Sequence, residues 1–141
     1  MKTEDCYEQI AVRLGELHKR IKNLQNQMLK KYDISLMEYH ILIMIIRMND
    51  VSQNDIADAL DVDKALISRQ ISAMEQKGLL SCAIDPECRR RKMLYLSEKA
   101  FALIPKLQEA HRLSLVRIFA DIEEQQLFEL QSALEGLVSK I

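Results

Sequence analysis

Two short amphipathic helices joined by a tight turn restrict the folds that are open to this chain. Ser52 with Asp55 three residues later is a capping pattern that predicts the start of the first helix, which ends near Leu60. Asp63 is a favourable N-cap residue for the second helix, and Gly78 predicts its end. Two helices connected in this way form a helix-turn-helix motif.

The segment after the second helix predicts a β-hairpin. Residues 79–84 and 92–96 are rich in Leu, Ile, Met and Tyr with partial alternation, and the sequence DPECRRR lies between them. The expected hairpin therefore has a long basic tip that contains Arg89, Arg90 and Arg91. Such a hairpin, placed directly after a helix-turn-helix, is a wing.

Further helices are expected on both sides of this motif. A helix over about residues 4–31 precedes it, and Ser35 with Glu38 predicts a capping box for a strongly apolar helix through HILIMII. Ser97 is expected to cap a helix that continues through Pro105 with a kink. The last helix is expected to start with a capping pair formed by Asp121 and Glu124.

Both ends of the chain carry apolar seams. The spacing alternates between four and three residues, which is typical of a helix that faces another helix. A core built around the middle helices would leave these seams partly uncovered, so a second copy of the chain is expected to cover them. The seam residues are Ile10, Leu14, Leu17, Ile21, Leu24 and Met28 in the first helix, and Leu127, Leu130, Leu134, Leu137 and Ile141 in the last.

The expected fold is mainly α with a small β-hairpin. Its 141 residues suit a single domain that spans residues 1–141. A winged helix-turn-helix lobe is expected over residues 35–97, and long dimerisation helices over residues 1–32 and 98–141.

Composition excludes several classes of function. The three glycines are not clustered as nucleotide-binding loops require, and no nucleophile, base and orienting group occur at a catalytic spacing. No apolar run approaches the roughly 18 residues that span a bilayer, and no signal peptide is visible. The odd number of cysteines does not form a disulfide framework. We therefore expect a cytoplasmic protein that is neither an enzyme nor bound to a membrane.

Charge is distributed unevenly along the chain. The net charge is −1, yet the segment 64–92 holds seven basic residues against three acidic ones, a balance of +4. The remaining 13 basic and 18 acidic residues give −5. A basic surface on an acidic body is typical of a protein that binds nucleic acid.

The second helix of the motif has a narrow outward face. Successive residues of a helix advance by about 100°, which brings Ile67, Ile71 and Met74 within about 60° of one another as a buried stripe. Ser68, Arg69 and Ser72 then face outward together with Ala65 and Gln76. Small side chains let a helix enter the major groove of DNA, and an arginine can pair with guanine O6 and N7. Taken alone, such a face is also typical of a solvated helix, but its combination with the turn and the arginine-tipped wing favours DNA.

These residues carry a family resemblance. The stretch QNDIADALDVDKALISRQISAMEQKGLL followed by DPECRRRKMLYLSEKA resembles the winged helix-turn-helix of the MarR family of transcription regulators, and the flanking helices extend the resemblance over essentially the whole chain. The resemblance implies a homodimer that binds a pseudo-palindromic operator in double-stranded DNA and usually represses transcription. It also implies that Arg69 reads bases and that Arg90 is the wing-tip arginine. The residues expected to contact DNA are Ser52, Asn54, Lys64, Ala65, Ser68, Arg69, Ser72, Arg89, Arg90 and Arg91.

Two positions depart from the family pattern. Asp61 stands where the turn often has glycine, a tolerable change because aspartate can adopt a left-handed conformation. Cys88 replaces the usual aspartate that steadies the wing arginine. Either Asp85 or Glu87 is a candidate substitute, and a less ordered wing is the alternative.

The resemblance also implies a crevice that binds small aromatic or anionic compounds. His40 and His111 approximately match two ligands of zinc-responsive relatives, but the other ligands are replaced and two histidines cannot complete a tetrahedral site. No metal or other cofactor is therefore expected. The expected lining residues, which are otherwise part of the core, are His18, Tyr39, His40, Met44 and His111.

Cys88 is a candidate redox residue because neighbouring guanidinium groups stabilise a thiolate, and an ordinary exposed cysteine is the alternative.

The sequence thus predicts a homodimeric, sequence-specific transcription regulator, a repressor released by a small-molecule or oxidant signal. A protein-interaction module on the same scaffold, without DNA binding, is the alternative, because a fold does not fix a function.

Overall fold

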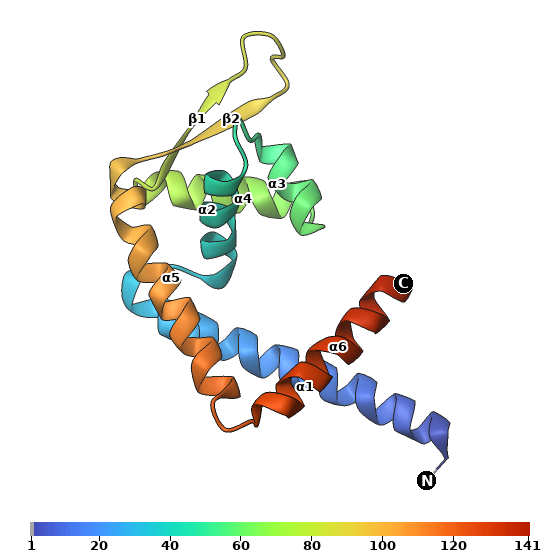
Figure 1. Ribbon diagram of the computed structural model, residues 1–141. Helices are drawn as coiled ribbons and strands as arrows, with labels where there is room; N and C mark the ends of the chain where they lie inside the picture. Colours follow the sequence, from blue (N-terminus) through green and yellow to red (C-terminus); the bar gives the residue numbers. More distant parts are fainter. Residues whose placement is uncertain (1) are drawn as a thin grey trace.

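The computed structural model describes residues 2–141, and its elements follow the order expected from the sequence (Figure 1). A short 3₁₀ helix, η1, connects the first two α-helices. The elements are α1 (Thr3–Leu29), η1 (Lys30–Tyr32), α2 (Leu36–Arg47), α3 (Gln53–Leu60), α4 (Lys64–Gln76), β1 (Leu80–Ile84), β2 (Lys92–Leu96), α5 (Glu98–Phe119) and α6 (Glu124–Lys140).

Side-chain caps set the starts of three helices. Ser35 Oγ accepts a hydrogen bond from the backbone N–H of Glu38 at 3.1 Å, and Glu38 Oε1 accepts from the N–H of Ser35 at 3.0 Å. Ser52 and Asp55 form the same reciprocal pair at 3.1 and 2.8 Å. The hydroxyl of Ser97 caps α5. These caps confirm the helix starts predicted from the sequence.

The start of α6 differs from the prediction. Glu123, in an extended backbone conformation, occupies the N-cap position without a side-chain hydrogen bond. Asp121 lies in the preceding turn, which is closed by a hydrogen bond from Ile122 N–H to the carbonyl of Phe119 at 3.2 Å. The expected capping pair of Asp121 and Glu124 was therefore wrong, because the turn after α5 delays the helix start by two residues.

The helix-turn-helix is made by α3 and α4. Asp61 adopts the left-handed conformation (φ 52°, ψ 51°) that the turn requires. Asp63 then caps α4, since its Oδ1 accepts from the N–H of Ala65 at 3.1 Å. Gly78 follows the end of α4 with φ 74°, a conformation that favours glycine. The sequence therefore predicted both ends of the motif correctly.

The hairpin forms the wing and joins the helical lobe through β2. Its strands are antiparallel, with a register from Leu80 opposite Leu96 to Ile84 opposite Lys92. The N–H of Leu94 also donates to the carbonyl of Val51 at 3.1 Å. The segment before α3 is thus paired with β2. This pairing fixes the position at which the wing leaves the helical lobe.

One apolar core links the winged lobe to α1 and α5. Each of the helices from α1 to α5 supplies a side chain with no exposed surface, namely Leu29, Leu42, Ile56, Ile67 and Leu107 in chain order. Burial of this kind is the main stabilising contribution to the fold. The long helices and the helix-turn-helix are therefore parts of one packed body.

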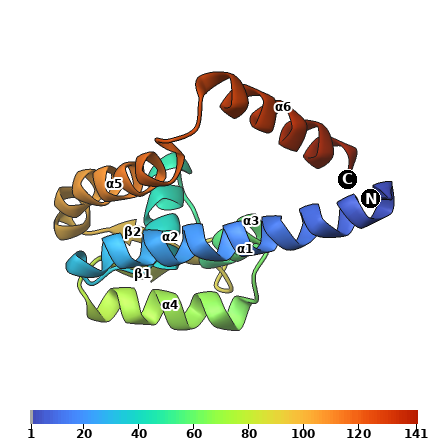
Figure 2. The ribbon, with the colours of Figure 1, turned by 90° about the horizontal axis from the view of Figure 1, so that it is seen from below.

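The two long helices α1 and α5 pack side by side, whereas α6, which crosses α1 in Figure 1, stands apart from both of them in Figure 2. None of the side chains of α6 is buried within the chain. No helix in residues 2–141 combines the length and hydropathy needed to cross a membrane. The exposed apolar side chains on these helices include Tyr7, Ile10, Leu14, Leu17, Phe128, Leu130, Leu137 and Val138.

Candidate nucleic-acid interface

Helix α4 buries one face and exposes a narrow polar one. Ile67 and Met74 have no exposed surface and Ile71 is 1% exposed, as the apolar spacing predicted. The opposite side presents a cation and small side chains to solvent, a surface that fits the major groove. On that side Ala65, Arg69 and Ser72 are exposed and Ser68 is partly exposed, and Lys64 is exposed in the first turn of the helix.

The two residues expected from α3 lie in different environments. Asn54 is exposed in the first turn of the helix. Ser52 is only 2% exposed, and its hydroxyl is occupied as the acceptor of the capping box. The structure thus gives Ser52 a capping role and leaves Asn54 free for a polar contact.

The tip of the wing is closed by its own backbone. The N–H of Asp85 donates to the carbonyl of Arg91 at 2.9 Å, and the N–H of Cys88 donates to the carbonyl of Asp85 at 3.2 Å. The carboxylate of Asp85 accepts from the N–H of Glu87 at 2.9 Å. In the described chain neither Asp85 nor Glu87 forms an ion pair with an arginine. Asp85 therefore orders the turn through the backbone.

The three wing arginines do not share one environment. Arg89 and Arg90 are exposed at the tip. Arg91 instead turns back to the lobe, where its Nη2 lies 3.0 Å from Asp55 Oδ2 and 3.2 Å from the carbonyl oxygen of Asp50. Arg91 was expected to contact DNA together with Arg89 and Arg90; its side chain is instead paired with Asp55 of α3, a contact that the sequence did not indicate.

Asp55 therefore has two partners. Its carboxylate completes the cap of α3 and accepts from Arg91. The hydrogen bonds from Ser52 are the main cause of a lowered pKa of Asp55, and Arg91 lowers this pKa further. The sequence had identified Asp55 only as part of the capping box, and no local pattern pointed to its pairing with Arg91, 36 residues away.

Four cations of α4 and the wing tip have no ionic partner among residues 2–141. They come from the start and middle of α4 and from the wing tip: Lys64, Arg69, Arg89 and Arg90. An unpaired cation on the protein surface is available to a phosphate or a base edge. The basic charge seen in segment 64–92 therefore remains largely unneutralised where it faces outward.

Three of the five residues expected to line an effector crevice form an aromatic cluster. The rings of Tyr39 and His111 stack with centroids 4.8 Å apart, and the ring of His40 lies 5.7 Å from that of Tyr39. His111 Nε2 also lies 3.1 Å from Nε2 of Gln25, which therefore acts as the donor to a neutral imidazole. Met44 packs against the core, whereas His18 is exposed on α1 and makes no ring contact with the cluster in the described chain.

Burial changes the ionisation of this cluster. Desolvation lowers the pKa of His40 and of His111, and the charge of His111 adds to the effect on His40. Desolvation also raises the pKa of Tyr39. In the part of the chain that the structure describes, no group of three or more His, Cys, Asp or Glu side chains is placed to hold a metal ion.

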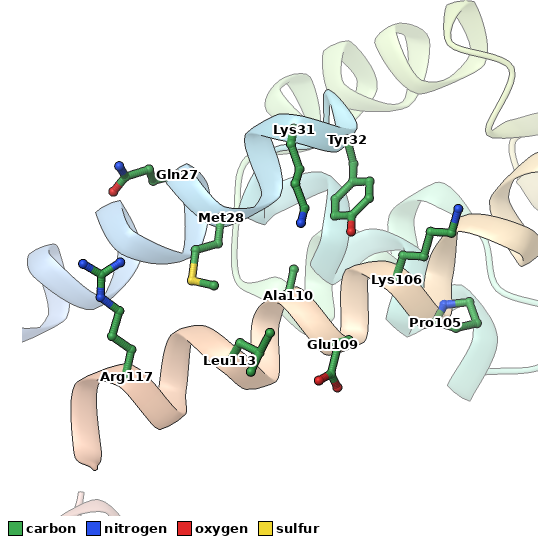
Figure 3. Close-up of a pocket in the computed structure, with 10 residues that line it drawn as sticks. All are labelled: Gln27, Met28, Lys31, Tyr32, Pro105, Lys106, Glu109, Ala110, Leu113 and Arg117. Atoms are coloured by element: carbon green, nitrogen blue, oxygen red, sulfur yellow. The ribbon is translucent and has the colours of Figure 1, made fainter. Parts of the chain in front are cut away.

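A separate cavity of about 590 Å³ lies between α1 and α5 (Figure 3). Met28, Ala110 and Leu113 contribute apolar surface to it, and Tyr32 contributes a phenol ring. None of the five residues expected from the sequence lines it. Its cationic side chains are Lys31, Lys106 and Arg117.

The three cysteines are free thiols. Cys88 is exposed at the wing tip and Cys6 is exposed on α1. Burial raises the pKa of Cys82 to about 11, and the hydrogen bond that Cys82 donates to Glu75 at 3.1 Å contributes to this rise. Cys82 is partly buried on β1 and packs against the core.

Known proteins resemble this chain in sequence. A model of the MarR family matches residues 32–91. The HTH-type transcriptional regulator BilQ of Clostridioides difficile (strain CD3) is 31% identical over 93 residues, which cover 66% of this chain and 63% of BilQ. The HTH-type transcriptional repressor IacR of Pseudomonas putida is 25% identical over 86% of this chain and 73% of its own length. Both relatives are transcriptional regulators, in agreement with the expectation that the chain is not an enzyme.

A solved structure supports the same fold. The crystal structure of the S. aureus MepR–DNA complex matches 93% of this chain and 97% of its own with a TM-score of 0.83, at 20% sequence identity. The winged arrangement of α2–α4 with the β1–β2 hairpin, flanked by long helices, is therefore shared with a protein that has been solved on DNA.

Proposed function

Because the chain belongs to the MarR family of transcription regulators, we propose that it acts as a homodimer that binds a pseudo-palindromic operator and represses transcription. In this dimer each α4 enters the major groove of one half-site, and the two half-sites lie about 34 Å apart. Each wing reaches the neighbouring minor groove, where the negative potential attracts arginine.

The observation that carries this proposal is the placement of unpaired cations. Arg69 lies on the exposed face of α4, and Arg90 lies at the tip of the wing, so one lobe offers a cation to each groove. Arg69 is suited to pair with guanine, which gives sequence specificity. Arg90 supplies mainly electrostatic affinity.

The exposed seams support the homodimer. Leu14 and Leu17 are each 39% exposed on α1, and Leu130 and Leu137 are 38% and 50% exposed on α6. Apolar surface of this extent on long helices favours association, and two copies with the same surface form a symmetric pair. We expect α1, α5 and α6 to form that interface.

Selection of bound fragments from the source genome tests the proposal. The wild-type protein is expected to enrich a duplex with two inverted half-sites, and its affinity is expected to fall steeply between about 50 and about 200 mM salt. Arg69→Ala is expected to abolish the preference for the selected site, with a cost of about 1–3 kcal/mol, and Arg90→Ala to weaken binding to all duplexes and reduce the salt slope by about one.

Arg112→Ala is the matched control, because Arg112 is an exposed arginine on α5 that already pairs with Glu109. It is expected to bind like the wild type. A dimer that enriches no duplex and shows no salt-sensitive binding would instead be a protein-interaction module.

We also propose that a small organic anion releases the repressor by occupying the cavity between α1 and α5. Its volume of about 590 Å³ lies within the range of small-molecule sites, and it combines apolar side chains with Lys31, Lys106 and Arg117. The aromatic cluster of Tyr39, His40 and His111 is the alternative effector site, and oxidation of Cys88 is the alternative signal.

A set of aromatic and aliphatic carboxylates, tested by thermal shift and by release of the selected duplex, distinguishes these possibilities. An effector in the cavity is expected to lose affinity in Arg117→Met and to retain it in His111→Gln. Release that depends on hydrogen peroxide and is lost in Cys88→Ser supports the oxidant instead.

A further inference from the structure

Lys77 follows the last residue of α4 and makes a dense set of polar contacts. We propose that Lys77 is a positioning residue, which fixes the orientation of α4 relative to α1 and α5 and thereby the geometry of the two recognition helices in the dimer. This inference rests on the proposed function, because it concerns how that dimer meets its operator.

The ammonium group of Lys77 has three acceptors. Its Nζ donates to the carbonyl oxygen of Asp33 at 2.6 Å and lies 3.0 Å from each carboxylate oxygen of Glu38. An ammonium group has three N–H donors, so these contacts use its full capacity. Glu38 is only 5% exposed and Lys77 is partly buried. The direction of this side chain is therefore set by hydrogen bonds from two sides.

The acceptors belong to the corner between α1 and α2. Glu38 also accepts from the N–H of Ser35, which places its carboxylate at the start of α2. Asn26 of α1 accepts from the N–H of Leu36 at 2.8 Å, so the same corner is bonded to α1. Lys77 thus connects the end of α4 to the point where α1 meets the winged lobe.

The backbone after α4 is bonded to the start of α5. The carbonyl of Lys77 accepts from Lys99 Nζ at 2.6 Å, and the carbonyl of Gly78 accepts from the hydroxyl of Ser97 at 2.6 Å. Hence α1 and α5 are both connected to the C-terminal end of α4. Residues 77 and 78 are a junction between the reading helix and the expected dimer helices.

The other contacts of α4 with these helices are less directional. Apart from the bonds of residues 77 and 78, no side-chain hydrogen bond or ion pair among residues 2–141 joins α4 to α1, α2 or α5. Ile67, Ile71 and Met74 pack into the core, and apolar packing has no preferred direction. Removing Lys77 therefore leaves α4 packed but less well oriented.

Orientation matters because α4 is anchored at one end and reads DNA along its length. At 1.5 Å per residue, Lys64 lies about 20 Å from Lys77. A rotation of about 10° at Lys77 moves Lys64 by about 3.4 Å, the rise of one base pair. A small change at this end is therefore enough to shift the reading helix by one step on the operator.

The test compares wild-type protein with the double variant Lys77→Met/Glu38→Gln. Removing the lysine alone leaves a buried carboxylate without a partner, which destabilises the fold, whereas neutralising both partners avoids this. Glutamine retains the acceptor for the N–H of Ser35. Lys22→Met is the control, since Lys22 is an exposed lysine on α1 whose ammonium has no bonded partner in the described chain.

The temperature of unfolding is measured for each protein. The affinity for the selected operator is then divided by the affinity for a random duplex. This ratio is measured again for operators with one base pair added or removed at the centre. The double variant is expected to unfold near the wild-type temperature and to remain a dimer. Its ratio of operator affinity to random-duplex affinity is expected to fall at least about tenfold, which corresponds to the loss of one contact with a base. Its preference for the operator with the original spacing between half-sites is expected to disappear.

A folded, dimeric double variant that keeps the wild-type ratio and spacing preference overturns the inference. If the double variant does not fold, Lys99→Met is tested instead, because it removes the exposed hydrogen bond from Lys99 to the carbonyl of Lys77. This variant is expected to reduce the same affinity ratio. An unchanged ratio then overturns the inference. Wild-type protein that selects no duplex contradicts the proposed function itself, and that result is separate from any difference between wild type and variant.

Discussion

Arg91 and Asp55 join the wing to the helix-turn-helix, with Arg91 Nη2 at 3.0 Å from Asp55 Oδ2. The pair lies where the loop of the wing tip meets β2, and β2 is itself bonded to the backbone of Val51. Because Asp55 also caps α3, one carboxylate contributes both to the start of that helix and to the direction of the hairpin. The pair thereby restrains the tip that carries Arg89 and Arg90 relative to α3.

Asp55→Asn is expected to lower stability at neutral pH and not at acid pH. The pKa of Asp55 is lower in the folded protein than in the unfolded chain, so the carboxylate stabilises the fold above its unfolded pKa of about 3.9, and this stabilisation is lost as the pH falls through the folded value. The pair is more than a third exposed, so we expect a loss of roughly 0.5–1 kcal/mol at pH 7. Thermal unfolding from pH 7 to pH 3 measures it. Asp58→Asn, on the same helix and exposed, serves as the control, and a difference that does not shrink between pH 7 and pH 3 would contradict the argument.

Leu14→Glu is expected to yield a monomer. Leu14 is 39% exposed in one chain and belongs to the seam of α1, where a charge buried against a second copy would lack a partner. Sedimentation equilibrium measures the state of association. Asn23→Glu adds the same charge outside the seam of α1 and should leave the dimer intact; equal behaviour of the two variants would place the interface elsewhere.

Gly78→Ala and Gly136→Ala are expected to change stability in opposite directions. Gly78 has φ 74°, so alanine there adopts a left-handed conformation that costs about 1–2 kcal/mol. Gly136 lies within α6, where alanine favours the helix by about 0.5–1 kcal/mol. Apart from the neighbouring backbone, nothing in the described chain lies within 4 Å of an added Cβ at either position, so backbone conformation decides the sign. Denaturant unfolding of the dimer checks both, and destabilisation by both variants would point to contacts across the dimer.

Cys82 is expected to be the least reactive cysteine. Its pKa of about 11 keeps it protonated at pH 8, whereas Cys6 and Cys88 are exposed to reagent. Alkylation with iodoacetamide at pH 8, followed by mass spectrometry of peptides, is expected to modify Cys6 and Cys88 well before Cys82. Guanidinium-unfolded protein should react at all three positions, which controls for peptide recovery. Faster modification of Cys82 in the folded protein would refute its packing.

The sequence predicted those parts of the fold that depend on neighbouring residues. The capping boxes at Ser35 and Ser52 are visible in the sequence because each needs only a partner three residues later. The buried stripe of α4 follows from helical spacing, and the turn from Asp61. At Asp121 the same capping pattern failed, because a turn between two helices can place a competing residue at the N-cap.

The sequence did not predict contacts between distant residues. No local pattern indicates that Arg91 pairs with Asp55, 36 residues earlier, or that Lys77 pairs with Glu38, 39 residues earlier. The cavity between α1 and α5 arises from the packing of two helices and likewise leaves no local pattern.

The effector crevice stays a prediction, although three of the residues expected to line it lie together. Tyr39, His40 and His111 do come together, as the resemblance implies, although they lie outside the cavity between α1 and α5. His18 lies on an exposed part of α1, two turns of helix before the buried Gln25 that contacts His111. A resemblance in sequence does not show which turns of a long helix face the core.

Helix α6 has a consequence for how long the protein survives. A 17-residue helix without a buried side chain is only marginally stable by itself, so in a dilute sample it is expected to fray and to expose its backbone to proteases. Association protects it by mass action. In the proposed dimer, the resistance of α6 to proteases is therefore expected to rise with the concentration of the protein.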